Sequence, residues 1–291
     1  DFNEIFKDSE FKVFSNTLET GGSLKGLILR NNHSEDFTRR VIDQYTDLVK
    51  KNGLMGLVVL KYENNEFSGS AAKFISDVEK ERIVETHQLA HGDVLFIGSG
   101  AWEVTCNAIG ALRLQLAKDF DLIPRDVFKY AWVVDFPMFE EDEEGNLVAR
   151  HHPFTAPQKA HIEMLDKDPL SVIAEAYDLV LNGFEIAGGS MRIYEQALQE
   201  KMFSLIGFTD EEIQKRFGFF VDAFQYGTPP HGGIAFGLDR FAMALTQSNS
   251  IRDVIAFPKN ASARCPLTQA PSKATDTQLE DLHLIIDYPE K

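Results

Sequence analysis

Residues 231–240 read His-Gly-Gly-Ile-Ala-Phe-Gly-Leu-Asp-Arg and combine three glycines with an arginine. The pattern predicts a short strand, a break at Gly237 and then an amphipathic helix with Arg240 in its first turn. A cation is mildly unfavourable there, because the helix dipole is positive at its N-terminus. An anion that meets both Arg240 and the free backbone N–H groups removes this conflict, and the glycines let a bulky ligand approach. The segment therefore indicates a polyphosphate site; the alternative is an ordinary strand-to-helix junction with a solvated arginine.

A second candidate segment, residues 182–193, carries Glu185 and Arg192 with two glycines between them. A regular strand would place these two side chains on opposite faces, because they are seven residues apart. Gly188 and Gly189 permit a bulge, which would return both side chains to one face. A carboxylate can hold Mg²⁺ on phosphates, and an arginine can bind a substrate carboxylate through two hydrogen bonds. The alternative is a Glu–Arg pair across strands on a solvated face.

A third segment, residues 151–157, reads His-His-Pro-Phe-Thr-Ala-Pro. Pro153 favours an extended His152 and Pro157 stiffens the other end, so the loop can hold an imidazole over a pocket. A structural histidine without a binding role is the alternative. Together the three segments offer a cation for a terminal phosphate, an acid for a metal and a cation for an acidic substrate. That combination suits activation of a carboxylate by ATP.

Composition excludes several classes of protein. The 291 residues include 44% hydrophobic ones, enough for a substantial core and about two domains. No apolar run approaches the ~20 residues that span a bilayer, and the N-terminus lacks a signal-peptide pattern. Two separated cysteines, Cys106 and Cys265, suit a reducing cytosol, so we expect a cytoplasmic protein without disulfides or a membrane partner. A net charge of −16 argues against general nucleic-acid binding through overall charge.

The first part of the chain alternates strand-like and helix-like patterns, which predicts a compact α+β or α/β unit over roughly residues 12–120. We expect strands at 24–30, 56–62 and 93–97, and helices at 36–51, 76–85 and 103–116. Ser76 or Asp77 is expected to cap the second of these helices.

The second part predicts an antiparallel sheet with helices on its face. We expect a strand at 130–139, an acidic turn at 140–146 and a return strand at 147–150. Helices are expected at 168–181 and 195–206, with a strand at 183–194 between them. Thr209 and Glu212 have the spacing of a capping box and predict the start of another helix.

These motifs resemble the bacterial-type aspartyl-tRNA synthetases. Gly-Leu-Asp-Arg at 237–240 resembles motif 3 of the class II synthetases, and segments 182–192 and 151–157 resemble that family's aspartate-pocket segments. Segments 132–140 and 251–259 also match. Segments 71–74 and 110–114 resemble the GAD domain that is inserted into the bacterial enzymes. The resemblance covers essentially the whole chain.

The resemblance implies an α+β fold, with the C-terminal half of a class II antiparallel sheet and its flanking helices, plus an inserted α/β GAD domain. In that division residues 1–11 are a connector from the catalytic domain, 12–120 the GAD domain and 121–291 the C-terminal half of the catalytic domain. The implied activity is that of an aspartate–tRNA ligase, with ATP, L-aspartate and tRNA(Asp) as partners, Mg²⁺ as the metal and a homodimeric parent enzyme.

The resemblance also implies a role for each site residue. Arg240 binds the γ-phosphate, while Gly237, Leu238 and Asp239 line the ATP site. Glu185 contacts ATP through Mg²⁺, and Arg240 and Glu185 form the catalytic pair. Arg192 pairs with the aspartate side chain and His151 also touches the aspartate.

Several family features have no counterpart in the sequence. The N-terminal OB-fold anticodon-binding domain, motif 1 and motif 2 are missing, and no Phe-Arg-x-Glu pattern occurs. The chain also begins at Asp1 rather than at a methionine. We therefore expect a partial chain that does not form the adenylate alone.

Two other functions stay open at this point. One is a non-catalytic module that binds tRNA or a protein partner through its GAD domain. The other is a class II-like ligase that activates an amino acid without tRNA.

Overall fold

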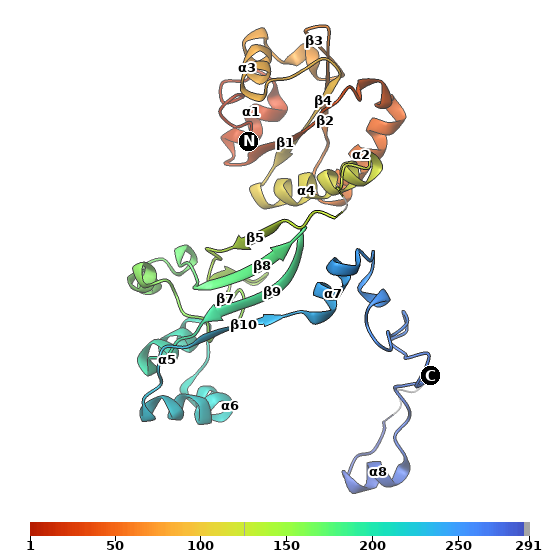
Figure 1. The fold of residues 1–291 in the computed structure, drawn as a ribbon. Helices are drawn as coiled ribbons and strands as arrows, with labels where there is room; N and C mark the ends of the chain where they lie inside the picture. Colours follow the sequence, from red (N-terminus) through yellow and green to blue (C-terminus); the bar gives the residue numbers. More distant parts are fainter. Residues whose placement is uncertain (125, 288–291) are drawn as a thin grey trace. The chain divides into compact units, whose positions relative to one another are not determined.

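The computed structural model describes residues 1–124 and 126–287, and the chain divides into two compact units, Asp1–Asp126 and Val127–Lys291 (Figure 1). Each unit has its own sheet and its own hydrophobic core.

The first unit is built on a four-stranded sheet in the order β1-β4-β2-β3. Every neighbouring pair in it is antiparallel, which makes the unit α+β. Its strands are β1 (Ser23–Leu29), β2 (Val58–Glu63), β3 (Glu66–Ser68) and β4 (Asp93–Gly100). Its α-helices are α1 (Lys12–Glu19), α2 (Arg39–Lys51), α3 (Asp77–His87) and α4 (Trp102–Asp119).

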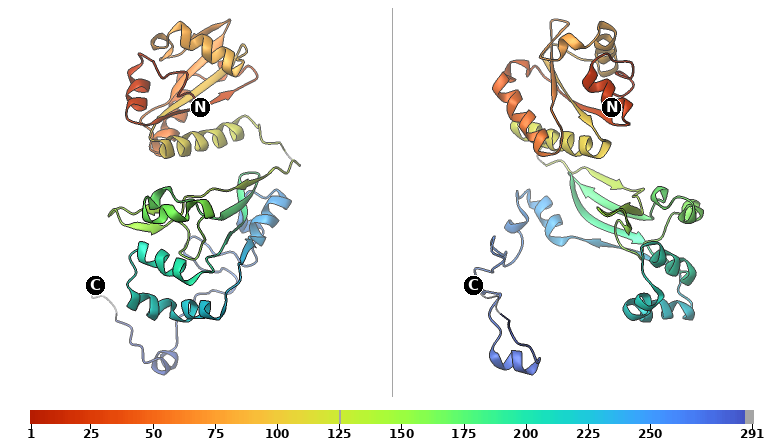
Figure 2. Two further views of the ribbon diagram at one scale, coloured as in Figure 1. Left: turned by 90° about the vertical axis from the view of Figure 1, so that its left-hand side faces the viewer. Right: turned by 180° about the vertical axis from the view of Figure 1, so that it is seen from behind.

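Strand β4 is buried on both sides because helices cover both faces of this sheet. Val94 and Phe96 pack with residues of α2 and α4, whereas Leu95 and Ile97 pack with residues of α1 and α3. Figure 2 shows α3 and α4 on opposite sides of the sheet. Residues 1–11 belong to this unit, because Phe2, Ile5 and Phe6 are buried in the same hydrophobic cluster as Leu95 and Ile97.

The second unit contains the sheet β10-β9-β8-β5, which is antiparallel throughout, and a separate hairpin of β6 and β7. Its strands are β5 (Tyr130–Val133), β6 (Phe139–Glu141), β7 (Leu147–Ala149), β8 (Ala176–Leu181), β9 (Phe184–Met191) and β10 (Gly232–Phe236). Its α-helices are α5 (Gln196–Leu205), α6 (Asp210–Ala223), α7 (Leu238–Thr246) and α8 (Asp276–Asp281).

Both predicted capping signals are confirmed. Ser76 accepts a hydrogen bond from the backbone N–H of Glu79, and the Glu79 carboxylate accepts one from the backbone N–H of Ser76. Thr209 and Glu212 form the same reciprocal pair at the start of α6. These bonds satisfy backbone donors that have no partner inside a helix, which is why the two helices begin at these residues.

The helix predicted at residues 168–181 is wrong. A short 3-10 turn at Pro169–Ser171 is followed by strand β8. Asn182 and Gly183 both have positive φ and join β8 to β9 as a two-residue hairpin turn. The residues that lead into such a turn pair with the strand that leaves it, so residues 176–181 are extended rather than helical. The strand predicted at 130–139 is also too long, because Asp135 takes a left-handed conformation and ends the extended run.

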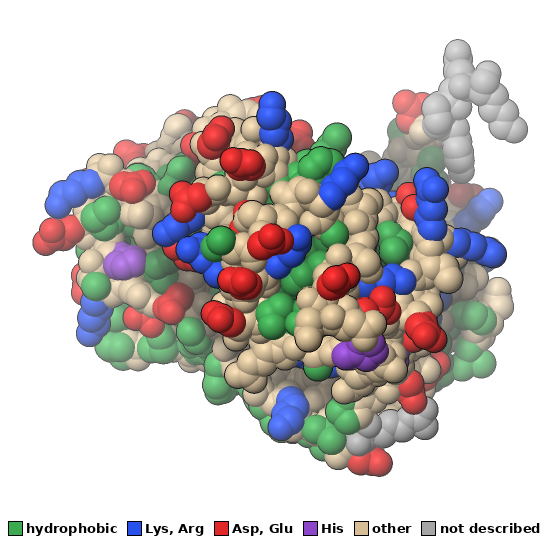
Figure 3. Space-filling view, turned by 90° about the horizontal axis from the view of Figure 1, so that it is seen from above, with side chains coloured by type: hydrophobic (Ala, Val, Ile, Leu, Met, Phe, Trp, Pro, Cys, Tyr) green, Lys and Arg blue, Asp and Glu red, His purple; other side chains and the backbone are tan. Residues whose placement is uncertain are grey.

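Charged side chains of both signs are interspersed on the face of the molecule in Figure 3. The two cysteines are free. Within the described residues, no helix is long and apolar enough to cross a lipid bilayer.

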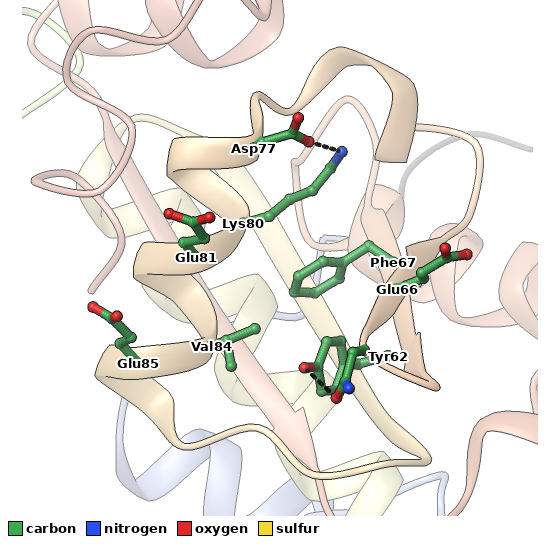
Figure 4. A pocket seen from close by; sticks show the side chains of 9 residues that line it. Tyr62, Glu66, Phe67, Asp77, Lys80, Glu81, Val84 and Glu85 are labelled. Atoms are coloured by element: carbon green, nitrogen blue, oxygen red, sulfur yellow. Dashed lines mark hydrogen bonds and ion pairs between the residues drawn. The ribbon is translucent and has the colours of Figure 1, made fainter.

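A hollow of about 510 Å³ lies in the first unit between α3 and the β2–β3 hairpin (Figure 4). Tyr62 and Phe67 lie on its hairpin side, and Glu81 and Glu85 on its helix side. Lys80 is paired with Asp77. None of the residues that the sequence singled out for chemistry lies here.

Candidate active site

Strand β9 contains the bulge that Glu185 and Arg192 require, although at a different position from the one predicted. Leu179 of β8 pairs with Ala187 and Val180 pairs with Glu185, so Ile186 is the extra residue. Gly188 and Gly189 instead lie in the regular part of the strand. Because of the bulge, the side chains of Glu185 and residue 188 point to the same face of β9 although they are three residues apart. A bulge between Glu185 and Arg192 with this effect was predicted from the sequence.

Glu185, Gly188 and Ser190 consequently lie along one face of β9, and Arg192 follows the last residue of the strand. A Cβ atom added to Gly188 would lie 3.6 Å from Glu185 Oε1, so the Glu185 carboxylate occupies the side toward which Gly188 faces. Ser190 and Arg192 follow on that side by alternation. From Gly188 to Arg192 the strand rises about 13 Å at ~3.3 Å per residue. A ligand that touches both ends must therefore be elongated.

Arg240 lies at the Glu185 end of this face. Gly237 is the N-cap of α7, and its backbone N–H donates to the carbonyl of Ile186 over 2.8 Å, which fixes the start of the helix against the bulge. Arg240 Nη1 donates to the backbone carbonyl of Glu185 at 2.8 Å and lies 3.7 Å from Glu185 Oε2. Both side chains are about half exposed, so they remain accessible to a ligand.

A small cavity of about 180 Å³ opens at this junction. Glu185, Gly237, Asp239 and Arg240 are among the residues that line it. The side chain of Leu238, the first residue of α7, is 76% exposed instead. The cavity combines a guanidinium group, a carboxylate and the N-terminus of a helix, and this set of groups suits a metal-bound phosphate.

Asp178 of β8 is a second carboxylate beside Glu185. It pairs with Gly188, and its Oδ1 would lie 2.6 Å from a Cβ atom added there. Burial raises the pKa of Asp178 above its ordinary value, the negative charge of Glu185 raises it further, and His151 partly offsets both. Two adjacent carboxylates whose charges oppose each other are an arrangement that a cation relieves. Asp178 is not among the predicted site residues, because a helix was predicted at 168–181 and the residue lies on strand β8 instead.

Arg192 lies at the other end of the face, and His152 is the histidine in contact with it. Arg192 Nη1 is 3.5 Å from His152 Nδ1, which also accepts a hydrogen bond from the backbone N–H of Phe154 at 3.2 Å. Burial lowers the pKa of His152, and the positive charges of Arg192 and His151 lower it further. His152 is therefore neutral at pH 7, and Arg192 is the cation at this end.

His151 lies one residue away from this contact. It is exposed, and its ring packs edge-on against Phe136 with 4.9 Å between ring centroids. Its positive charge lowers the pKa of Asp178 as well as that of His152, so it lies within electrostatic reach of both. An aspartate contact was predicted for His151 alone; the extended conformation that Pro153 favours at His152 was the available signal for the second histidine.

Thr155 and Ser190 connect the histidine loop to β9. Both are buried, and the Thr155 hydroxyl donates to Ser190 Oγ at 3.4 Å. The same hydroxyl lies 3.3 Å from His152 Nε2. The structure thus brings the three predicted segments to one face, with Glu185 and Arg240 in contact at one end and Arg192 with the histidine loop at the other.

Among the described residues, no group of three or more histidine, cysteine or acidic side chains could hold a metal ion by itself. Asp178 and Glu185 are two oxygen donors, which fits Mg²⁺ because this ion is usually bound by one or two carboxylates with phosphates and water as its other ligands. The site therefore suits a magnesium ion that arrives with a phosphate ligand.

The second unit is thus an antiparallel sheet with a Glu185–Arg240 pair and an Arg192–His152 contact at opposite ends of one strand. The family model for tRNA synthetases class II (D, K and N) matches residues 10–261. The chain belongs to this family.

Curated relatives match over nearly the whole chain. An aspartate–tRNA ligase of Halalkalibacterium halodurans is 49% identical over 287 residues, which cover 98% of this chain and 48% of the relative. An aspartate–tRNA(Asp/Asn) ligase of Geobacillus sp. (strain WCH70) is 46% identical over 292 residues, which cover 100% of this chain and 49% of the relative. The chain spans about half the length of the curated relatives it matches.

Solved structures give a weaker similarity. The aspartyl-tRNA synthetase of Entamoeba histolytica superposes with a TM-score of 0.37 at 22% identity, over 52% of this chain and 26% of that one. The family assignment rests on the sequence match.

Proposed function

We propose that this chain supplies the magnesium–ATP and aspartate contacts of an aspartate–tRNA ligase. One observation carries the proposal: Glu185 with Arg240 and Arg192 with His152 occupy the two ends of one face of β9. The family match and the names of the curated relatives support it.

The Arg240 end of the face is proposed to bind ATP. Arg240 binds the γ-phosphate, and Gly237, Leu238 and Asp239 border the nucleotide at the start of α7. Asp178 and Glu185 hold Mg²⁺, which neutralises phosphate charge when it is bound. The hydrogen bond from Arg240 to the Glu185 carbonyl holds the guanidinium group in place before ATP arrives.

The Arg192 end is proposed to bind L-aspartate. Arg192 pairs with the side-chain carboxylate, with His151 and His152 beside it. Neutral His152 does not compete with the substrate for Arg192 as an anion would. Asparagine in the same place leaves Arg192 without its anion, and a site built on such a polar contact rejects the wrong substrate by roughly 10⁴-fold or more.

In the proposed reaction the aspartate α-carboxylate attacks the α-phosphorus of ATP and pyrophosphate leaves. The aspartyl group then passes from AMP to tRNA(Asp). These residues contribute positioning and charge neutralisation, and no covalent enzyme intermediate is needed.

Wider properties of the enzyme are part of the same proposal. They comprise a homodimeric parent enzyme, a cytoplasmic location, a GAD domain at residues 12–120 and the C-terminal half of the catalytic domain at 121–291. Because no Phe-Arg-x-Glu sequence is present, we expect this chain alone to exchange pyrophosphate with ATP far more slowly than a complete enzyme. Each missing electrostatic donor at the reacting phosphate costs ~3 kcal/mol or more.

Two arginine variants test the two ends of the site separately. Arg192→Ala is expected to weaken L-aspartate binding about 10- to 100-fold, because hydrogen bonds to charged groups contribute ~1.5–3 kcal/mol. Arg240→Ala is expected to weaken Mg²⁺–ATP binding by a similar factor. Isothermal titration calorimetry on the purified chain measures both affinities.

Each variant is expected to leave the other ligand's affinity within twofold. Arg264→Ala, an exposed arginine of the same unit, is the matched control and should alter neither. If Arg192→Ala left aspartate affinity unchanged while the wild type still bound tRNA, the chain would be a binding module rather than part of a ligase.

A further inference from the structure

The histidine loop is held from behind by helix α5. Gln199 of α5 is fully buried, and its Nε2 donates to the carbonyl oxygen of Pro153 at 2.8 Å. Pro153 is the residue that follows His152. The orientation of the amide is set by this contact, because a carbonyl oxygen can only accept.

The other half of the Gln199 amide is unsatisfied. Within the described residues, Oε1 is buried and has no hydrogen-bond partner. A buried polar atom without a partner costs about 1–3 kcal/mol, whereas an apolar side chain of similar size at this position would avoid that cost. Gln199 is thus a poor choice for packing alone, and residues of this kind are expected where function requires a particular contact.

Phe154 supplies a second attachment for the same loop. Its ring packs among Phe220, Phe217 and Phe203 at centroid distances of 4.9, 5.7 and 6.1 Å. Its carbonyl oxygen accepts from the backbone N–H of Ile193 at 3.0 Å, directly after Arg192. The Phe154 ring and backbone therefore fix the loop just after Pro153.

His152 precedes these attachments in the chain. Among the hydrogen bonds of the described residues, the one from Gln199 is the only one that the Pro153 carbonyl accepts. Rotation of the peptide plane between Pro153 and Phe154 would move the Phe154 N–H that donates to His152 Nδ1. Gln199 prevents that rotation by holding the carbonyl of the same peptide plane.

We propose that Gln199 is a positioning residue that holds the Pro153–Phe154 peptide plane and thereby keeps the His152 ring against Arg192. Gln199 touches neither histidine nor arginine and acts only through the loop. Its consequence for aspartate binding rests on the proposed function, whereas its effect on His152 does not.

The variant Gln199→Met tests the proposal because it keeps the side-chain size and removes the donor. We expect the melting temperature to change little, because removal of the unsatisfied Oε1 offsets the loss of the hydrogen bond to Pro153. We expect the pKa of His152, measured by NMR on the ligand-free chain, to rise toward 6.5 as the ring leaves Arg192 and its buried place. L-aspartate affinity should fall about tenfold, as expected when a supporting residue is lost.

Gln196→Met is the matched control. Gln196 lies on the same helix, and its amide donates to the carboxylate of Glu200 at 2.8 Å rather than to the histidine loop. This variant should leave the pKa of His152 and the aspartate affinity unchanged. An effect as large as that of Gln199→Met would overturn the proposal.

A measurement on the wild type covers the case in which Gln199→Met does not fold. The side-chain amide protons of Gln199 should exchange slowly with water and show contacts to Pro153 in NMR spectra. Fast exchange, or a folded Gln199→Met with an unchanged His152 pKa, would overturn the proposal. If His152 responds as expected but the wild type does not bind L-aspartate, the proposed function fails and the role of Gln199 stands.

Discussion

Arg192 and Arg240 carry the same charge but are held by different neighbours. Arg240 donates to a backbone carbonyl and faces the carboxylate of Glu185, so its charge is partly neutralised before a ligand arrives. Arg192 faces a neutral histidine, so its charge is not offset in this way. A free carboxylate is therefore attracted more strongly to Arg192, and a ligand that brings its own cation suits the Arg240 end.

At the residue scale, His152 is expected to make stability depend on pH. Its pKa in the folded chain is lower than the ordinary value of 6.5, so the unfolded chain binds its proton first as the pH falls. Stability is therefore fully present above pH 6.5 and decreases as the pH falls from 6.5 through the folded pKa. We expect His152→Gln to reduce this loss.

Thermal unfolding of the wild type and His152→Gln between pH 8 and pH 5 measures the effect. The two curves should run parallel above pH 6.5 and converge or cross below it. Parallel curves across the whole range would show that His152 keeps its ordinary pKa in the folded chain.

At the scale of secondary-structure elements, the contact between β9 and β10 depends on Gly189. A Cβ atom added there would lie 1.9 Å from the carbonyl oxygen of Gly233, closer than any real contact. Because β10 leads directly into α7, a shift of β10 would also move Arg240 away from Glu185. The close approach of these strands therefore sets the geometry of the ATP end.

Gly189→Ala is accordingly expected to lower the free energy of unfolding by about 1–3 kcal/mol, the usual range for overpacking. Gly233→Ala on the facing strand is the matched control, because an added Cβ atom there meets nothing within 4 Å. Urea denaturation measures both. Equal losses for the two variants would contradict the clash.

At the scale of the whole molecule, each compact unit has its own core. The first unit buries aromatic and aliphatic side chains on both faces of its sheet, and residues 1–11 complete one of these cores. We expect residues 1–126 to fold when they are expressed alone, with a single cooperative thermal transition.

Circular dichroism and amide NMR on the isolated segment test this expectation. Its amide spectrum should overlay on the signals of the same residues in the full chain. A version that begins at residue 12 is the informative comparison, because it lacks Phe2, Ile5 and Phe6 and should melt at a lower temperature. Loss of structure in the 1–126 segment itself would show that its cores do not suffice.

The sequence alone determined the features that depend on neighbours along the chain. The cap at Ser76, the capping box at Thr209, the amphipathic helix predicted at 36–51 and found at Arg39–Lys51, and the order of strand, Gly237 and helix at the Arg240 segment are all local. Their signals lie within a few residues of one another, because caps and helical turns join residues three or four apart.

Tertiary structure decided which side chains meet. The position of the bulge at Ile186, the place of Asp178 beside Glu185 and the choice of His152 as the neighbour of Arg192 all follow from strand pairing and loop packing. An extra residue in a strand changes which side chains share a face, and nothing in the local sequence of β9 says at which residue the extra one falls. The chemistry of the site was therefore readable from residue types, whereas its geometry depended on contacts between segments far apart in the chain.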